Sequence, residues 1–290
     1  MSPIATAPPQ HAGRNGGNAR PWEGYGRLDR SVPIEGQPYW EVSVHSPIAY
    51  LDGWPRTRQM SEADIGQTIE AFALVARRAE AVGFDVIELD CAHGYLLHQI
   101  LSHETNRRAD GWGGSATVRM RLPLGVARAV RRRWPVHKPL FVRIYVTDEA
   151  GWTLDDLAGF TRGLKACGVD LIDCSSGGLR GRWPTAAGTP GPMGYQVPYA
   201  ERVRRQADMA TMADGLIMEA EHADSFIAHG QADLFAIGRE MLLNSFWPVQ
   251  AAVRLGVDPH YELMPPNHPV VARPARARGL VACREPGHAH

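Results

Sequence analysis

Acidic, imidazole and phenolic side chains follow one short apolar run in this chain. The run is Val86–Leu89, and Asp90, Cys91, His93 and Tyr95 come directly after it. An imidazole and a phenol can donate hydrogen bonds or transfer protons, and a carboxylate can accept them. Side chains at the C-terminal end of a strand occupy the position where barrel enzymes carry out their chemistry. The stretch therefore predicts an active site at this strand end.

The same stretch carries an ordered series of motifs. They read DCAHGYL at 90–96, NRRADGWGGS at 106–115 and, in part, VRMR at 118–121. This series resembles the old yellow enzyme family of FMN-dependent ene-reductases, especially its smaller bacterial branch. The resemblance implies a TIM (β/α)8-type barrel, with FMN as cofactor and NAD(P)H as reductant.

Other matches extend the resemblance toward both ends of the chain. HAGR at 11–14 matches the end of the third barrel strand, and GYQVPYA at 194–200 matches the segment after strand six. The family has a long segment before the first of these motifs, whereas only ten residues precede it here. In addition, Pro8 stands where the family places a flavin-contacting glutamine, and Gln10 is out of register. The resemblance therefore implies a barrel that lacks its N-terminal part, with strands four to eight recognisable.

The resemblance also implies roles for the catalytic residues. Tyr95 matches the tyrosine that donates a proton to the substrate, and His93 matches one of two residues that hydrogen-bond the substrate carbonyl. Asp90 stands where the family has the other donor, usually histidine or asparagine. An ionised carboxylate cannot donate. Asp90 is therefore protonated in its pocket, or orients His93, or leaves the carbonyl site impaired.

Four residues are candidates for holding the cofactor. Arg143 interrupts an apolar strand, and its guanidinium must find an anionic or carbonyl partner. That partner is either a carboxylate inside the barrel or, as the resemblance implies, the flavin N1–C2 carbonyl region. Gly238 and Arg239 follow the last strand and Gly215 follows the strand before it, where barrel enzymes bind phosphate. Asp214 is a departure, because the family usually has a small or apolar residue there.

Helical and extended patterns alternate from residue 61 onward, which favours βαβ units and a parallel sheet. The expected helices cover 61–83, 116–134, 154–167, 198–207, 219–229 and 247–255, and the expected strands cover 85–91, 140–146, 171–174, 209–217 and 234–237. The stretch between the first strand and residue 116 is expected to be an active-site loop. The predicted organisation is an irregular segment at 1–60 with a remnant of barrel strand three, a barrel portion at 61–256 and an irregular tail at 257–290.

Composition limits the class of protein. The 31 basic and 31 acidic residues cancel, which argues against a nucleic-acid or membrane-surface partner. Four cysteines without C-x-x-C spacing, and histidines without ligand spacing, predict no metal site. No apolar run is long enough to span a membrane, and the first residues do not resemble a signal peptide. These features predict a cytoplasmic protein.

The sequence thus predicts an FMN-dependent NAD(P)H oxidoreductase that reduces activated C=C bonds, as in enones, in a small-molecule substrate. Two alternatives remain open. One is an inactive barrel fragment, and the other is a module of a larger flavoprotein that acts on CoA esters. A homo-oligomer, or a partner that supplies the missing strands, would cover the sheet edges that an incomplete barrel exposes.

Overall fold

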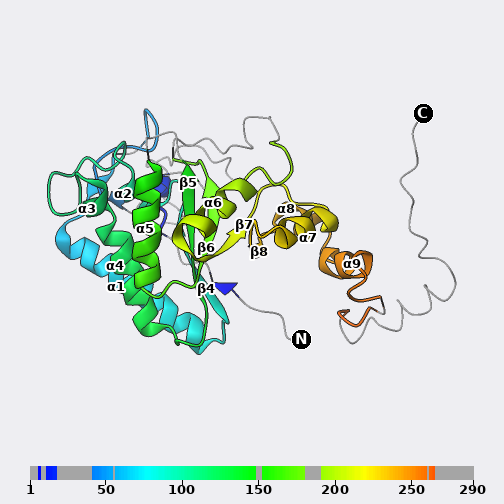
Figure 1. Ribbon diagram of the computed structural model, residues 1–290. Coiled ribbons are helices and arrows are strands. Elements are labelled where there is room, and N and C mark those ends of the chain that lie inside the picture. The colour runs from blue at the N-terminus through cyan, green and yellow to red at the C-terminus, as the bar shows by residue number, and fades with distance from the viewer. Residues whose placement is uncertain are drawn as a thin grey trace.

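The structure is a computed structural model that describes residues 6–7, 11–17, 41–54, 56–147, 152–179, 191–259 and 261–264. Most of this part consists of strands that alternate with helices, arranged around one parallel sheet (Figure 1). Pro8, Gln10, Cys283 and most of the predicted C-terminal tail lie outside the described residues.

Six parallel strands form the central sheet. Their order across it is β1 (Thr6–Ala7), β4 (Val86–Cys91), β5 (Leu140–Thr147), β6 (Leu171–Ser176), β7 (Ala210–Ala213) and β8 (Leu234–Phe235). A separate parallel pair joins β2 (Ser43–Val44) to β3 (Arg58–Gln59). From β4 onward each strand pairs with the next one in the chain, which is the connectivity of a (β/α) barrel.

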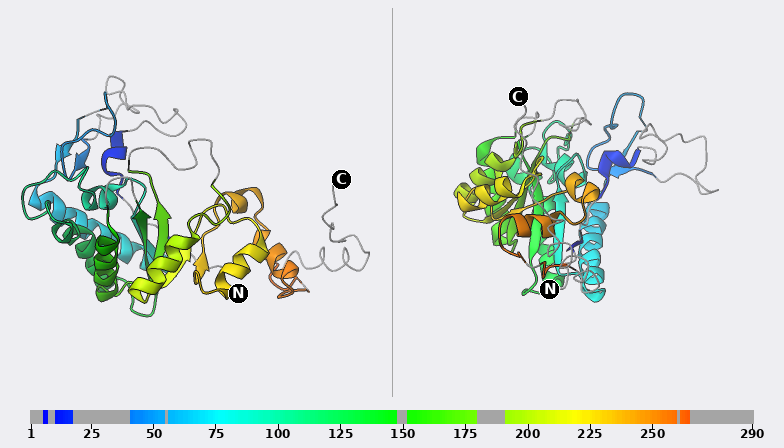
Figure 2. Two further views of the ribbon diagram at one scale, coloured as in Figure 1. Left: turned by 45° about the horizontal axis from the view of Figure 1, so that its top comes forward. Right: turned by 90° about the vertical axis from the view of Figure 1, so that its right-hand side faces the viewer.

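Ten helices occur in the described ranges. They are η1 (Gly13–Gly17), α1 (Glu62–Ala81), α2 (Leu96–Leu101), α3 (Ala116–Arg119), α4 (Arg121–Arg133), α5 (Leu154–Ala166), α6 (Val197–Ala207), α7 (Ala220–Ala228), α8 (Arg239–Leu243) and α9 (Trp247–Arg254). Helices α1, α4 and α5 lie on one side of the sheet, whereas α7, α8 and α9 lie beyond its β8 edge (Figures 1 and 2).

Helix α1 shows how local sequence begins these elements. Ser61 Oγ accepts a hydrogen bond from the backbone N–H of Asp64, and the Asp64 carboxylate accepts one from the backbone N–H of Ser61. This reciprocal pair satisfies two N–H groups that a helix start leaves free. Phe72 and Ala76 then lie on the buried face of the helix, which packs against α4. The predicted helix start is therefore confirmed.

The predicted barrel fold is confirmed, and within the described residues it is open. β1 pairs with β4 through Thr6↔Val86 and Ala7↔Ile87, so it takes the position of a strand that precedes β4. The HAGR motif follows at His11, and the expected remnant of strand three stays a prediction. Among the described strands, β1 and β8 each have one unpaired edge.

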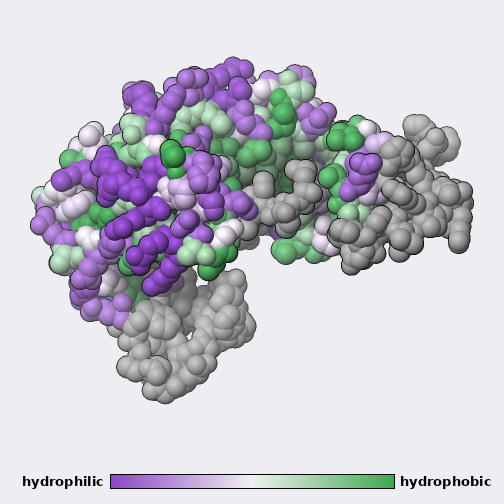
Figure 3. All heavy atoms as spheres, turned by 90° about the horizontal axis from the view of Figure 1, so that it is seen from below, coloured by the Kyte–Doolittle hydropathy of each residue, from purple (hydrophilic) through white to green (hydrophobic). Residues whose placement is uncertain are grey.

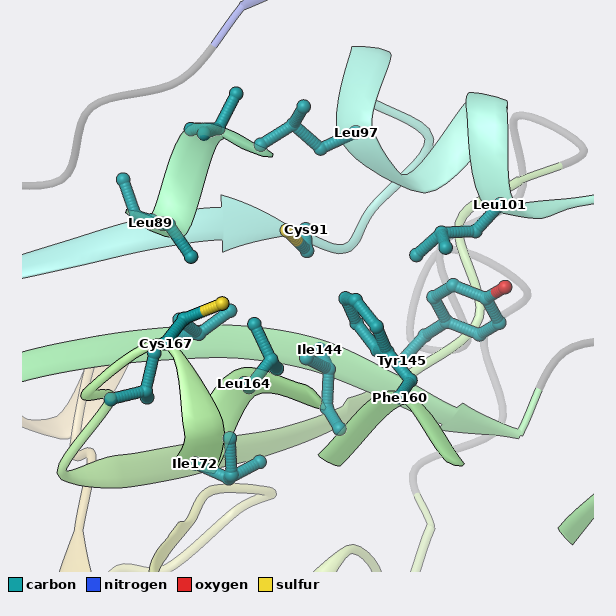
Figure 4. Close-up of a cluster of buried hydrophobic side chains, with 14 of the residues drawn as sticks. Leu89, Cys91, Leu97, Leu101, Ile144, Tyr145, Phe160, Leu164, Cys167 and Ile172 are labelled. Carbon is teal, nitrogen blue, oxygen red and sulfur yellow. The ribbon is translucent and has the colours of Figure 1, made fainter. Parts of the chain in front are cut away.

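Strand register separates apolar from charged side chains. Asp90 pairs with Arg143, and Arg143 pairs with Asp173, so these three side chains form one row across β4, β5 and β6. Successive strand residues point to opposite faces. Leu89 and Ile144 therefore lie on the helix side, within the hydrophobic core that Figure 4 shows between the strands, α2 and α5.

Several predicted boundaries were wrong. The expected loop after β4 contains α2, whose six residues are all buried, the polar His98 and Gln99 included. A helix without an exposed polar face lacks the amphipathic period that would reveal it. The single helix expected over 116–134 is two helices separated by Met120. The strand expected over 209–217 ends at Ala213, and the one expected over 234–237 ends at Phe235. Helix α8 was not predicted.

The C-terminal helices are poorly covered by the described chain. No side chain of α8 or α9 is buried within it, and Leu242 and Leu243 are 87% and 86% exposed. In the space-filling view, hydrophilic residues dominate the left side, and apolar residues gather from the middle toward the right, where these helices lie (Figure 3). Among the helices that the structure describes, none is both long enough and apolar enough to span a membrane.

Candidate active site

One cavity gathers the four predicted cofactor residues. It has a volume of about 640 Å³ and lies beside Arg143 of β5, at the ends of β7 and β8. Arg143, Gly215, Gly238 and Arg239 all line it. This volume falls within the range of small-molecule sites, roughly 300–1,000 Å³. The structure thus brings together residues that are up to 96 positions apart in the chain, from Arg143 to Arg239.

Arg143 is held by two carboxylates. Its Nη2 donates a short hydrogen bond to Oδ2 of Asp214, and its Nε lies 3.4 Å from Oδ2 of Asp173. Asp173 is fully buried. Burial raises the pKa of Asp173 well above its ordinary value, although Arg143 acts in the opposite direction. Of the two partners left open by the sequence, the structure therefore shows the carboxylates, and a flavin contact would add to or replace them.

The glycines have different steric surroundings. Gly215 has φ +108°, and a Cβ there would lie 3.0 Å from the ring of Tyr195 and 3.2 Å from the backbone N of Gln196. Glycine is therefore required at this turn. A Cβ at Gly238 would meet nothing within 4 Å. Arg239 is exposed beside it and makes no ion pair within the described residues. This end of the cavity thus has an open glycine and an exposed guanidinium.

His93 lies just after β4, in the left-handed region of backbone conformation. It has φ +54°, which is uncommon for a non-glycine residue. Next to it, a Cβ on Gly94 would lie 2.5 Å from the carbonyl oxygen of Gly178, and one on Gly178 would lie 2.7 Å from Cα of His93. The two glycines therefore allow the turns after β4 and β6 to touch, which places His93 above the sheet.

The imidazole of His93 faces a serine. Its Nε2 lies 2.8 Å from Oγ of Ser175, at the end of β6. Burial, followed by the nearby Arg143, lowers the pKa of His93 to about 3. The ring is therefore neutral at pH 7. If Ser175 donates to Nε2, the other ring nitrogen carries the proton and is a hydrogen-bond donor.

Asp90 is buried near the C-terminal end of β4. Its Oδ1 accepts a hydrogen bond from the backbone N–H of Ala92 at 2.8 Å, and it has no bond to His93. Burial raises the pKa of Asp90 to about 6, against the opposing effects of that bond and of Arg143. Of the three roles left open by the sequence, orientation of His93 has no support in the geometry. A protonated Asp90 does have support, at pH values below about 6.

Tyr95 is half-buried at the start of α2, two residues after His93. It lies close enough to Tyr50 to influence its ionisation. His93, Asp90 and Tyr95 do not line the 640 Å³ cavity themselves. The catalytic and cofactor candidates therefore lie at the same end of the sheet but do not line one cavity.

Buried polar residues connect the two groups. With its amide nitrogen facing Asp214, Gln196 donates to Oδ1 of Asp214, and its oxygen accepts from both N and Oγ of Ser176 at 2.9 Å. The same end of the amide lies 3.3 Å from Oγ of Ser175, the partner of His93. Sequence reasoning placed Gln196 in a loop beside the site and did not assign it a contact. The polar SSGG run, which begins with the last two residues of β6, was the available signal.

A scan against family models finds the NADH:flavin oxidoreductase / NADH oxidase family over residues 30–257. The chain belongs to this family. It is 42% identical over 219 residues to an NADPH dehydrogenase of Geobacillus thermodenitrificans and 39% identical over 231 residues to one of Bacillus subtilis. These matches cover 75% and 79% of this chain, and 62% and 65% of those proteins. The chain therefore spans less than two thirds of these relatives. The resemblance read from the sequence is confirmed, and so is the assignment to a family of oxidoreductases that use FMN and NAD(P)H.

Solved structures show the same fold. Morphinone reductase aligns with a TM-score of 0.61 at 23% identity, covering 79% of this chain and 64% of that one. A 2-naphthoyl-CoA reductase aligns with a TM-score of 0.67 at 23% identity, covering 74% of this chain and 33% of that one. At these identities the likeness supports the barrel fold alone.

Proposed function

We propose that this chain carries the cofactor and substrate residues of an FMN-dependent NAD(P)H oxidoreductase that reduces activated C=C bonds. The observation that carries the proposal is the convergence of Arg143, Gly215, Gly238 and Arg239 on one cavity of about 640 Å³. These residues fit a flavin mononucleotide: a guanidinium for the polar edge of the ring, and glycines with a second guanidinium for the phosphate. When bound, FMN would supply the hydride that it takes from NAD(P)H.

The protein's own residues would hold the flavin, bind the substrate carbonyl and donate the proton. Arg143 would stabilise negative charge at the flavin carbonyl, and Arg239 with the backbone near Gly215 and Gly238 would hold the phosphate. His93, neutral at pH 7, would donate a hydrogen bond to the carbonyl oxygen of an enone, where negative charge develops. The phenol of Tyr95 would then donate the proton to the α-carbon.

The test is a flavin titration followed by turnover. The purified chain is mixed with FMN, passed over a gel-filtration column and examined for flavin absorbance. We expect retained FMN and NAD(P)H-driven reduction of a simple enone, and loss of reduction with retained FMN in Tyr95→Phe. A colourless protein that gains no FMN would contradict the proposal.

A second component of the proposal concerns assembly. The unpaired edge of β8 and the exposed Leu242 and Leu243 favour a partner polypeptide, or a second copy, that covers this side of the sheet. A chain that stays monomeric, inert and without FMN would instead favour the inactive fragment. The CoA-ester module and the cytoplasmic location stay predictions.

A further inference from the structure

Asp214 forms an ion pair with Arg143, the cation on which the proposed flavin site depends. It follows β7, and its Oδ2 accepts the hydrogen bond from Nη2 of Arg143 described above. The two side chains are 18% and 23% exposed, so solvent screens their contact only partly. Both line the 640 Å³ cavity. A ligand that uses Arg143 must therefore displace or share this carboxylate.

The carboxylate is held from its other side as well. Gln196 donates to Oδ1 of Asp214 and is itself fixed by Ser176. Gln196 is buried and also lines the cavity. Because both oxygens have partners inside the protein, Asp214 is a fixed part of the cavity wall rather than a surface acid that has turned inward.

Acidic groups outnumber cations around this position. The charged or titratable side chains that face Asp214 or share its surroundings come from β4, β5, β6, the segment before α6 and α8; they are Glu88, Asp90, Arg143, Asp173, Cys174, Tyr195, Arg239 and Glu240. Burial raises the pKa of Asp214, although Arg143 and Arg239 act in the opposite direction. The uncharged form of Asp214 therefore persists to higher pH than that of an exposed aspartate.

We propose that Asp214 is an internal counter-ion that competes with the flavin ring for Arg143, so that the cavity binds flavin most readily when Asp214 is uncharged. The inference rests on the proposed function and adds a means of controlling it. An ionised Asp214 neutralises Arg143 and adds negative charge to the cavity. An uncharged one releases the guanidinium for a carbonyl acceptor. Flavin affinity should then fall as pH rises.

The experiment compares the full chain with Asp214→Asn by equilibrium dialysis against FMN and riboflavin, at constant ionic strength, from pH 5.5 to pH 8. The asparagine keeps the size of the side chain and removes its charge. We expect the variant to bind either flavin about tenfold more tightly than the wild type at pH 8, which is the effect of one charged hydrogen bond. The difference should shrink toward pH 5.5.

The decisive quantity is the flavin affinity of Asp214→Asn divided by that of the wild type at the same pH. The phosphate of FMN ionises in the same pH range, but it affects both proteins equally and cancels in this ratio. Riboflavin has the same ring without the phosphate. A pH-dependent ratio for both ligands would support competition at Arg143. A pH-dependent ratio for FMN alone would overturn it, because Asp214 would then act on the phosphate.

Controls separate this inference from the proposed function. Asp224→Asn removes an exposed carboxylate on α7 that lines no part of the cavity, and should bind flavin as the wild type does. Equal flavin binding by wild type and Asp214→Asn at every pH would overturn the role of Asp214 and leave the flavin site standing. No binding by either protein at any pH would overturn both the cofactor assignment and the inference.

Discussion

Nε2 of His93 and Oγ of Ser175 lie 2.8 Å apart, although 82 positions separate the two residues in the chain. The contact joins the tip of β4 to the end of β6. It fixes the ring of the residue proposed to bind the substrate carbonyl, and it depends on the close approach of Gly94 and Gly178.

Ser175→Ala should impair turnover without removing the flavin. Loss of one neutral hydrogen bond costs about 1 kcal/mol, so we expect kcat/KM for an enone to fall roughly fivefold because the His93 ring is less well oriented. Steady-state kinetics measure this, and dialysis checks that FMN affinity is unchanged. Ser225→Ala, which removes a hydroxyl on α7 that lines no part of the cavity, is the matched control. Equal losses in the two variants would contradict the positioning of His93 by Ser175.

The raised pKa of Asp90, about 6, gives a prediction for the pH profile of enone reduction. Below that value Asp90 carries a proton and can donate to the substrate carbonyl; above it, the carboxylate repels the developing charge. We expect kcat/KM to decrease as pH rises through about 6–7. Asp90→Asn, which donates at every pH, should remove this decrease. A wild-type profile that is flat from pH 5 to pH 8 would contradict the role of a protonated Asp90.

Glu88 should make folding stability depend on pH. Burial raises its pKa to about 7, so the folded state binds a proton that the unfolded state releases near pH 4.5. This contribution is present below the unfolded pKa and is lost as pH rises toward about 7. The buried His45 and His93, each with a pKa lowered to about 3, act in the opposite direction below pH 6.5.

The measurement is therefore a difference between two proteins. We expect the melting temperature of Glu88→Gln, minus that of the wild type, to increase between pH 5 and pH 8 by a few degrees, since about 1 kcal/mol corresponds to roughly 2–4 °C in a chain of this size. The histidines cancel in this comparison. A constant difference across the range would show that Glu88 titrates normally.

Two glycines of the cavity should respond differently to the same substitution. Gly215→Ala places a Cβ against Tyr195 at a φ of +108°, so it should destabilise the turn by about 1–3 kcal/mol and weaken flavin binding. Gly238→Ala meets no atom within 4 Å and should leave the fold intact. Thermal melting and FMN dialysis compare the pair. Equal effects in both would mean that the turn at Gly215 is not as described.

The apolar surface of α8 should govern association. Replacing Leu242 and Leu243 by serine should decrease self-association or partner binding while leaving the melting temperature within about 1–2 °C, because neither side chain packs against the described core. Sedimentation velocity measures the first effect. A large loss of stability in the double variant would instead indicate that α8 contacts a part of the same chain.

Much of the fold could be predicted from the sequence because apolar residues recur with different periods in the helices and strands of this barrel. The start of α1 at Ser61 and the apolar run of β4 follow local rules. Helix α2 could not be found in this way, since all six of its residues are buried, the polar His98 and Gln99 included, and no exposed polar face marks its period. Its helical state depends on tertiary packing around Leu97 and Leu101.

The site was predicted in part, for a similar reason. The convergence of Arg143 and Arg239 follows from barrel topology, which brings strand ends together. The contact between Arg143 and Asp214 could not be read from the sequence, because it depends on the direction of two side chains from different strands. Asp214 stood out only as a departure from the family pattern. Gln196 and Ser175 belong to the GYQVPYA and SSGG runs, but neither run indicates which side chains they contact.

The row of Asp90, Arg143 and Asp173 across three neighbouring strands also has a consequence for how the sheet assembles. If β5 shifted by one residue against β4 and β6, its guanidinium would move to the helix-covered side among Leu89 and Ile172, with no acid to meet it. Such a misaligned intermediate would bury an unpaired positive charge among apolar side chains. Opposite charges at matched positions thus discriminate against wrong strand alignments before any ligand is present.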